Sequence, residues 1–318
     1  MPAVIESTPR SAAAPAIVRA SARRLIFSGV FWILVTEAMF AIMRVATRWG
    51  AADRLSGWEV GGVRFLGGAL VAWALGRARG VRLVVGDQKN AWLRSLFGTG
   101  NACAVFYALG SPRIAVGDVA TISATAPLFV ALLSGPILGE RVGARIFVGA
   151  LIGFVGVGVL SRPALHVSGD IALALVLGAL CYGLAILRLR RMGPYESSEA
   201  IALHMSLVAG VTMLLLSLPR FVLPGPHALL PLLVSATAGG IGQVAMSRAY
   251  GLGRAAPLSA VSYAGVVFTY ALEILLFARM PGLHQCLGSL LVIAAGVVVS
   301  TRSRAPAEAD VPVAGAET

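Results

Sequence analysis

The pattern of apolar and polar positions divides the chain into ten long apolar stretches, separated by short segments that carry most of the charges. The stretches cover residues 26–47, 57–76, 91–110, 116–138, 143–161, 170–187, 199–218, 228–247, 257–278 and 283–301. A helix needs about 20 residues to cross the hydrocarbon core of a membrane. The pattern therefore predicts an all-α integral membrane protein with ten transmembrane helices.

The two ends of the chain differ from the apolar stretches. Residues 1–24 are rich in Ala, Pro and Ser and contain four arginines, and residues 303–318 are polar. We expect both segments to be disordered cytoplasmic tails. The first apolar stretch is too long for the core of a signal peptide and is followed by no small-residue cleavage site, so we expect it to remain as a helix.

The composition supports a membrane location and excludes several other classes. The chain is 58% hydrophobic and only 13% charged, whereas a soluble domain carries about 25% charged residues. This excludes an ordinary cytosolic enzyme and a disordered chain. The net charge of +12 comes from arginines in short clusters between the apolar stretches. Because these arginines do not form one basic face, we expect no nucleic-acid partner.

The distribution of basic residues predicts the orientation in the membrane. With the N-terminus in the cytoplasm, 18 of the 26 Lys and Arg residues fall on the inner side, 7 on the outer side, and Arg64 within a stretch. Cytoplasmic loops carry an excess of basic residues. We therefore expect a multi-pass protein of a bacterial inner membrane with both termini in the cytoplasm.

The two halves of the chain carry matching residues at a nearly constant spacing. Glu59 matches Glu199 at an offset of 140, and Gly149 matches Gly288 at an offset of 139. Because each half contains five stretches, an odd number, the second half must enter the membrane from the opposite face. Inverted repeats around a central cavity are typical of alternating-access transporters. The two expected five-helix repeats comprise residues 25–162 and 169–302.

The sequence contains no motif typical of an enzyme or of a metal site. It lacks a phosphate-binding glycine loop and a His-Glu-x-x-His pair, and its four histidines lie in separate segments. Cys103, Cys181 and Cys286 have no metal-ligand spacing, and we interpret them as packing residues. We expect no enzymatic activity, no cofactor and no metal.

Charged residues inside the apolar stretches are the strongest functional candidates. Each costs on the order of 3 kcal/mol at the membrane centre. Glu37 lies near the middle of the first stretch and shares a helical face with Arg44 and Arg48. Arg64 lies at a similar depth in the second stretch, so a Glu37–Arg64 pair is geometrically allowed. The pair could be structural, or Glu37 could belong to a substrate or proton path.

Other polar side chains recur within the apolar stretches. Tyr263, Tyr270 and Glu273 share one helical stripe, and a carboxylate there needs a wet or paired setting. Tyrosine rings would stack on apolar parts of a substrate, and amides would orient it. The complete set of candidate cavity residues is Glu37, Arg64, Asn101, Gln243, Tyr263, Tyr270 and Glu273.

Tyrosines near helix ends and one proline allow a simpler interpretation. Tyr107 and Tyr250 lie near the ends of their stretches, where tyrosines anchor at the membrane interface. Pro127, in the middle of the fourth stretch, removes a backbone hydrogen bond. A packing kink and a gating hinge are equally expected there.

Several short motifs, in order along the ten stretches, resemble the EamA type of the drug/metabolite transporter superfamily. In the first half they are Trp58-Glu59, Arg64-Phe65, Ala126-Pro127-Leu128 and Gly139-Glu140-Arg141. In the second half they are Gly239 to Gln243, Arg248 to Leu252 and Pro257 to Tyr263. The resemblance implies ten helices in two inverted five-helix repeats around a central cavity, and a secondary carrier of small metabolites.

The second repeat departs from this pattern at one point. Pro127 and Glu140 correspond to Val266 and Arg279, so the second repeat lacks the proline and the Gly-Glu signature. We therefore expect a kink in the fourth stretch and a straighter ninth stretch.

The resemblance also sets the functional expectation. Members of the family export amino acids and other metabolites or take up compounds such as cofactors. We expect export of amino acids or related amphiphilic compounds by alternating access, compatible with proton coupling, in a monomer or homodimer within the lipid bilayer. The alternatives are an uptake carrier for a cofactor or nucleoside-like compound, and a passive channel.

Overall fold

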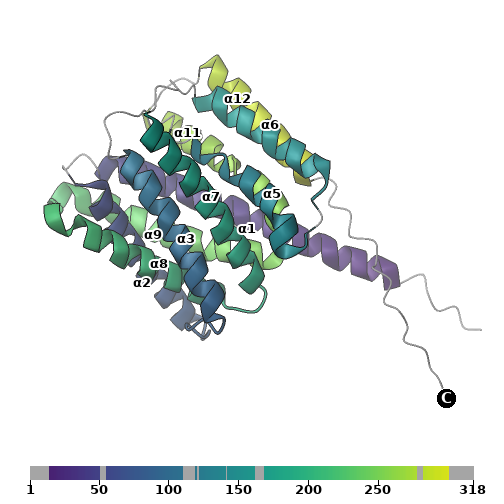
Figure 1. Cartoon of the computed structure of the whole chain (residues 1–318), viewed down its shortest axis with the longest axis horizontal. Coiled ribbons are helices and arrows are strands. Elements are labelled where there is room, and N and C mark those ends of the chain that lie inside the picture. The colour runs from purple at the N-terminus through teal and green to yellow at the C-terminus, as the bar shows by residue number, and fades with distance from the viewer. Residues whose placement is uncertain are drawn as a thin grey trace, which may run out of the picture.

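The computed structural model describes residues 14–50, 55–109, 119, 122–140, 142–161, 168–277 and 282–300, and these residues form helices and connections without a strand. The helices are α1 (Ala14–Gly50), α2 (Gly57–Ala78), α3 (Gln88–Leu109), α5 (Ala126–Leu138), α6 (Ala144–Ser161), α7 (Gly169–Met192), α8 (Ser198–Ser217), α9 (Pro226–Leu252), α10 (Ala255–Val261), α11 (Ala264–Phe277) and α12 (Leu283–Ser300), with the short 3-10 helix η2 (Leu218–Arg220). Figure 1 shows these helices gathered in a bundle. The prediction of an all-α fold is confirmed.

Many of the described helices have the length and composition of membrane spans. Five segments are long and apolar enough to cross a membrane: Ser28–Thr47, Gly169–Met192, Ser198–Arg220, Pro226–Leu252 and Ala255–Leu276. Ala126–Leu138, Ala144–Leu160 and Leu283–Val299 are shorter apolar helices. These segments are those of a multi-pass membrane protein. The number of ten spans stays a prediction.

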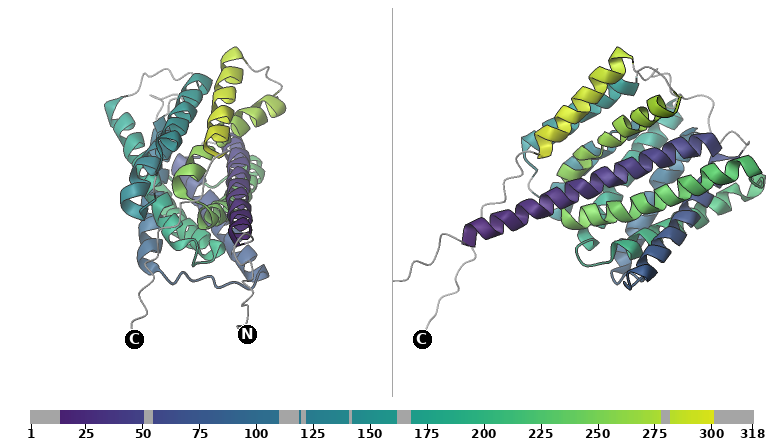
Figure 2. Two further views of the ribbon diagram at one scale, coloured as in Figure 1. Left: turned by 90° about the vertical axis from the view of Figure 1, so that its right-hand side faces the viewer. Right: turned by 180° about the vertical axis from the view of Figure 1, so that it is seen from behind.

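The first helix is longer than the sequence pattern predicts. Helix α1 begins at Ala14, so residues 14–24, which we expected to be a disordered tail, are helical. This segment is rich in Ala and Arg, which have high helix propensities. Figure 2 shows this end of α1 extending beyond the neighbouring helices. Residues 1–13 and 303–318, the rest of the expected tails, lie outside the described residues.

The main helix pairs join the first half of the chain to the second. Helix α1 packs along α9, and α3 packs along α7. Helix α2 packs on α8, and α6 and α12 lie side by side at one edge of the bundle (Figures 1 and 2). With the sequence offset near 140, α1 to α3 correspond to α7 to α9. The set of pairs therefore stays the same when the two halves are exchanged.

Glycines allow α2 and α9 to approach closely. A Cβ added to Gly240 would lie 2.9 Å from the Cα atom of Gly68, so the two backbones are in direct contact. Small residues commonly permit such approach between transmembrane helices. The contact also places Arg64 of α2 against Gly239 of α9, where an added Cβ would lie 3.1 Å from Nε of Arg64.

The predicted fourth span is interrupted rather than kinked in its middle. A turn at residues 124–125 precedes α5, and Pro127 lies in the first turn of that helix. Proline is favoured there because its missing N–H would have no intrahelical partner. The hydroxyl of Thr125 donates to the carbonyl oxygen of Ile122 at 2.7 Å. This side-chain bond competes with helical pairing and favours the turn.

The ninth predicted span is interrupted as well, so the expectation of a straighter helix there is wrong. Helix α10 ends at Val261, a turn occupies residues 262–263, and α11 begins at Ala264. The hydroxyl of Ser262 donates to the carbonyl oxygen of Ser259 at 2.7 Å. A hydroxyl that bonds the backbone therefore replaces proline as the local cause of the interruption.

Acidic side chains tie together several connections at one end of the bundle. Glu199, at the start of α8, forms ion pairs with Arg79 after α2 and with Arg248 of α9, the latter at 3.0 Å. Glu196 accepts a hydrogen bond of 2.8 Å from the N–H of Gly86. All five residues lie in or beside segments that the basic residues assign to the cytoplasmic side.

Glu140, which follows α5, holds the start of α10 at the same end. Its carboxylate accepts a hydrogen bond of 3.2 Å from the N–H of Ala255, the first residue of α10. It also lies 3.4 Å from Nε of Arg190 on α7 and 3.9 Å from Nε of Arg254. A carboxylate stabilises a helix N-terminus because the first N–H groups have no intrahelical partner. Glu140 therefore connects α5, α7 and α10.

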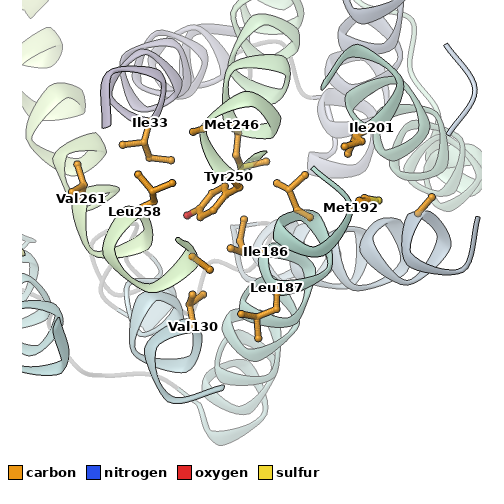
Figure 3. Close-up of a cluster of buried hydrophobic side chains, with 14 of the residues drawn as sticks. Ile33, Val130, Ile186, Leu187, Met192, Ile201, Met246, Tyr250, Leu258 and Val261 are labelled. Carbon is orange, nitrogen blue, oxygen red and sulfur yellow. The ribbon is translucent and has the colours of Figure 1, made fainter. Parts of the chain in front are cut away.

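A cluster of buried apolar side chains lies where α1, α7, α9 and α10 meet (Figure 3). Tyr250 of α9 is fully buried there, beside Ile33, Ile186 and Leu258. The interpretation of Tyr250 as an interfacial anchor is therefore wrong, because α7 and α10 enclose the end of α9. Tyr107, in contrast, is 48% exposed.

Candidate functional site

Glu37 is buried on the face of α1 that contacts α11. Its side chain is 6% exposed, and Oε2 lies 3.5 Å from Nη2 of Arg44 on the same helix. Residues seven positions apart share a helical face, and the predicted shared face of Glu37 and Arg44 is confirmed. The side chain of Arg44 is 42% exposed. The pair therefore joins a buried carboxylate to a partly accessible cation.

The carboxylate of Glu37 lies against the start of α11. A Cβ added to Gly265 would overlap Oε2 of Glu37, so a glycine is needed at this position. Nη1 of Arg44 donates to the carbonyl oxygen of Gly265 at 3.3 Å and to the hydroxyl of Thr269 at 3.2 Å. Glu37 and Arg44 thus link α1 of the first half to the helix that follows the interruption in the second half.

Arg64 has a different set of neighbours from the one we expected. Its guanidinium lies over the ring of Phe65 at 4.2 Å and near the ring of Phe40 at 6.0 Å, and its Nε contacts the sulfur of Met43. The expected ion pair with Glu37 is replaced by the Glu37–Arg44 pair. The faces of aromatic rings attract a cation, so these rings are favourable neighbours for the guanidinium of Arg64.

A third charged residue, Arg94 of α3, is more completely buried in the bundle than the sequence suggests. Arg94 is 2% exposed, and Nη2 donates to Oε1 of Gln243 on α9 at a long distance of 3.4 Å. Its Nε is buried and makes no hydrogen bond with the described residues. The Arg94 side chain runs beside Gly98 towards Met205 of α8. It therefore lies at the meeting point of α3, α8 and α9.

Two tyrosines lie within electrostatic range of Arg94 and Glu37 in the interior. Tyr182 of α7 and Tyr250 of α9 are both close enough to Arg94 and Glu37 for electrostatic interaction. The hydroxyl of Tyr182 lies 3.7 Å from the sulfur of Met246. The hydroxyl of Tyr250 is buried and has no hydrogen-bond partner among the described residues. Polar groups of α1, α3, α7 and α9 thus meet inside the apolar bundle.

Tyr263 lies in a different part of the bundle from these groups. It is 3% exposed and packs with Ala124, Val157 and Val292, and its ring lies against Gly153 of α6. Its hydroxyl donates to the carbonyl oxygen of Ala124 at 2.9 Å. Tyr263 thereby contacts the segment that precedes α5, rather than the group around Arg94.

The remaining candidates divide between separate locations. Asn101 of α3 is half-buried and faces Gly178 of α7, and Tyr270 of α11 is half-buried. The side chain of Glu273 lies outside the described residues. Pro127 lies in the first turn of α5. A role of these residues in a cavity, and of Pro127 in gating, stays a prediction.

The described residues contain no group of three or more His, Cys, Asp or Glu side chains that could hold a metal ion. The buried polar side chains that cluster here are cations, amides, hydroxyls and the Glu37 carboxylate. Such groups can bind and orient a polar or charged solute by hydrogen bonds and charge.

Sequence reasoning missed Arg94 because of its place near the start of a span. We counted it among the basic residues of the cytoplasmic side, although it lies six residues into α3, about 9 Å along the helix axis. A signal was present in the sequence, since Arg94 and Asn101 are seven residues apart and share a helical face. Two polar residues on one face of a membrane helix favour a buried position.

Sequence comparison relates both halves of the chain to a single family. The EamA-like transporter family matches residues 27–162 and, separately, residues 170–301. A crystal structure of another protein, 21% identical in sequence, superposes with a TM-score of 0.71 over 88% of this chain and 98% of its own. At this identity the superposition shows a common fold alone.

Several bacterial transporters are similar to this chain over most of their length. The pseudopaline exporter of Pseudomonas aeruginosa (strain UCBPP-PA14) is 24% identical over 278 residues, covering 87% of this chain and 97% of its own. The riboflavin transporter of Vibrio cholerae serotype O1 is 23% identical over 269 residues, covering 83% and 90%. An uncharacterized transporter of Helicobacter pylori (strain 26695) is 25% identical over 291 residues, covering 87% and 96%. The chain belongs to the EamA-like transporter family and is a multi-pass membrane protein.

Proposed function

We propose that this protein is a secondary transporter that exports amino acids or related amphiphilic metabolites across a bacterial inner membrane by alternating access. One observation carries the proposal: three buried charges of the first half contact helices of the second half. Glu37 lies against Gly265 of α11, Arg64 against α9, and Arg94 against Gln243 of α9. Charges inside a membrane bundle are costly and are typical of solute or ion paths.

We further propose that the halves are inverted five-helix repeats of a ten-span protein. Helix α1 packs on α9, α3 packs on α7, and α2 packs on α8, and this set of pairs is unchanged when the two halves are exchanged. Such packing supports a two-fold relation between the halves. The interruptions before α5 and before α11 support it as well, because the turns at residues 124–125 and 262–263 lie 138 residues apart, close to the offset of the sequence repeat. In inverted-repeat transporters, rocking of one repeat against the other opens the midplane site to each side in turn.

A counterflow experiment tests the transport proposal. The full chain is reconstituted in liposomes that are loaded with an unlabelled amino acid, and entry of the same labelled amino acid is measured. A carrier shows saturable entry of the labelled amino acid. Unlabelled amino acid inside accelerates this entry, because it occupies the binding site as the site returns to the outer side. Entry that is linear in concentration and indifferent to the loaded compound favours a passive channel and rejects the carrier.

Uptake of a cofactor is the second candidate function. It is favoured by the similarity to the riboflavin transporter of Vibrio cholerae over 83% of this chain. Riboflavin is therefore included in the counterflow experiment beside the amino acids. Counterflow of riboflavin without counterflow of any amino acid selects this alternative.

A further inference from the structure

We propose that Arg94 binds a carboxylate group of the transported compound. This inference rests on the proposed transport function and specifies the substrate class as compounds that carry a carboxylate. Its starting point is a buried cation whose charge is not neutralised within the described residues. Arg94 is 2% exposed, and no described carboxylate lies within ion-pair distance of it.

The nearby acidic groups have other partners. Glu37 pairs with Arg44 of its own helix at 3.5 Å. Glu199 pairs with Arg79 and with Arg248 near the end of the bundle. A buried ionic group without a partner is strongly unfavourable in an apolar interior. An arginine kept in this state can therefore gain much from an anion that enters the site.

The hydrogen-bonding capacity of Arg94 is largely unused. Its bond to Gln243, at 3.4 Å, is longer than the usual range for such bonds. Its buried Nε donates no hydrogen bond to the described residues. A guanidinium presents N–H groups in a planar fork that matches the two oxygens of a carboxylate. Arg94 therefore has both the charge and the free donors for such a ligand.

The surroundings of Arg94 contain further groups that could contact the rest of an amphiphilic molecule. The hydroxyl of Tyr250 is buried without a hydrogen-bond partner in the described part of the chain, and it lies within electrostatic reach of Arg94. Tyr182 adds an aromatic ring from α7, and Gln243 adds an amide from α9. The carboxylate would take the place of the long Gln243 contact, and the amide could then bind another polar group of the ligand.

The site also joins the two halves of the protein. Arg94 belongs to α3 of the first half, whereas Tyr182, Gln243 and Tyr250 belong to α7 and α9 of the second. A carboxylate bound at this point would bridge the surfaces that have to separate in an alternating-access cycle. Substrate binding would thereby affect the relative stability of the states that open to either side.

The test uses the purified full chain in detergent, with thermal unfolding as the readout. The probes are the standard L-amino acids, their carboxamides, which lack the anionic oxygen pair, and riboflavin, which carries no carboxylate. The variants are Arg94→Gln and Arg94→Lys. Arg220→Gln serves as the matched control, because Arg220 lies in η2 and is exposed.

We expect at least one amino acid to raise the Tm of the wild-type protein, while its amide has no effect. Arg94→Gln should bind this amino acid at least tenfold more weakly, and its ligand-free Tm should be equal to or higher than that of the wild type, because an unneutralised buried charge is removed. Arg94→Lys keeps the charge but loses the planar arrangement of N–H donors, and should bind the amino acid with intermediate affinity. Arg220→Gln should match the wild type in both measurements.

Each of the following outcomes overturns the inference. The first is stabilisation by an amide as large as that by the corresponding acid. The second is unchanged acid binding by Arg94→Gln, and the third is a lower ligand-free Tm of this variant, which shows a structural role. If riboflavin alone binds and undergoes counterflow, the inference fails while transport itself stands. If the wild type carries none of the probes in liposomes, the proposed transport of these compounds fails as well.

Discussion

The hydroxyl of Tyr263 donates a hydrogen bond of 2.9 Å to the carbonyl oxygen of Ala124, and the two residues lie 139 residues apart. The same offset relates Gly149 to Gly288 in the sequence repeat. Ala124 belongs to the turn before α5, and Tyr263 to the turn before α11. The two helix interruptions are therefore at matching positions in the two halves and are joined directly.

This bond satisfies a carbonyl that the interruption leaves outside regular helical pairing. In the apolar interior an unpaired carbonyl is costly, so a donor from the opposite half stabilises the turn. The tyrosine ring also fills space beside Gly153 of α6. Tyr263 is thus placed to hold the two halves together, in addition to any contact with a solute.

Replacement of Tyr263 by Phe tests this role. The change keeps the ring against Gly153 and removes the hydroxyl that bonds Ala124. We expect the free energy of unfolding to fall by about 1–3 kcal/mol, since the buried carbonyl loses its partner. Thermal unfolding in detergent measures the effect. Tyr107→Phe is the control, because its exposed hydroxyl makes only a 3.4 Å contact with Asp170. Equal stability of both variants would contradict the assigned role.

Replacement of Gly265 by Ala tests the contact between α1 and α11. The added methyl group would overlap the carboxylate of Glu37, which has to move together with its partner Arg44. Overpacking of this kind costs about 1–3 kcal/mol. We expect a lower Tm and reduced counterflow in the reconstituted protein.

Gly158→Ala in α6 is the matched control for Gly265→Ala. Among the described residues, no neighbouring atom lies within 4 Å of an added Cβ at Gly158. Alanine has a higher helix propensity than glycine, so this variant should be as stable as the wild type or more stable by up to about 1 kcal/mol. If Gly265→Ala behaves like Gly158→Ala, the close contact with Glu37 is absent in the membrane.

Replacement of Glu140 separates its ion pairs from its role at the start of α10. Glu140→Gln keeps an oxygen that can accept from the N–H of Ala255 but loses the charge that faces Arg190 and Arg254. Because these side chains are partly exposed, we expect a loss of about 0.5–1 kcal/mol for Gln and about 1–2 kcal/mol for Ala. Unfolding is measured at low and high NaCl. Salt screens the ion pairs, so the difference in the free energy of unfolding between wild type and Glu140→Gln should be smaller at high NaCl. A Gln variant as unstable as the Ala variant would show that charge alone matters.

The orientation predicted from the basic residues can be tested by labelling. In a protein whose three cysteines are replaced, single cysteines at His227, next to Pro226, and at Lys89, next to Asn90, occupy exposed positions. A membrane-impermeant maleimide on intact cells should label the first site and not the second, because the distribution of basic residues predicts a cytoplasmic location for the segment around residue 89. Labelling of the second site alone would reverse the orientation.

The order of the helices was predictable from the sequence, but the two interruptions were not correctly placed. Long apolar stretches report length and periodicity, so they show where a helix lies without showing where it is broken. At Thr125 and Ser262 the break involves a single hydroxyl that bonds a carbonyl three residues earlier. In such a bond the side-chain hydroxyl competes with backbone N–H groups for a carbonyl oxygen. Only some Ser and Thr residues interrupt a helix in this way.

Two of the three buried charges of the site were also predictable, whereas their partners were not. The cost of a charge in the membrane identified Glu37 and Arg64 from the sequence alone. Depth along a helix, however, does not determine rotation or the direction of a long side chain. Arg64 turns towards Phe65 and Met43, and Glu37 turns towards Arg44 of its own helix.

The last prediction concerns the function of Glu37. If its carboxylate binds and releases a proton during the cycle, Glu37→Gln should abolish transport driven by a proton gradient and leave counterflow intact. Glu37→Asp, which keeps a titratable group, should retain part of the driven transport. Both variants are measured in liposomes with an imposed pH difference. Because Arg44 holds the carboxylate at 3.5 Å and contacts Gly265 and Thr269, a protonation change at Glu37 would loosen the link between α1 and α11.

A purely structural pair leads to a different pattern. Glu37→Gln should then lower the free energy of unfolding by about 1–2 kcal/mol and affect driven transport and counterflow equally, since the ion pair is only partly buried. Replacement of both Glu37 and Arg44 by Met should restore the stability, because neither partner is left unpaired. We favour proton coupling, since the structure joins this buried carboxylate to a cation that is 42% exposed. Normal stability together with wild-type driven transport in Glu37→Gln would reject both roles.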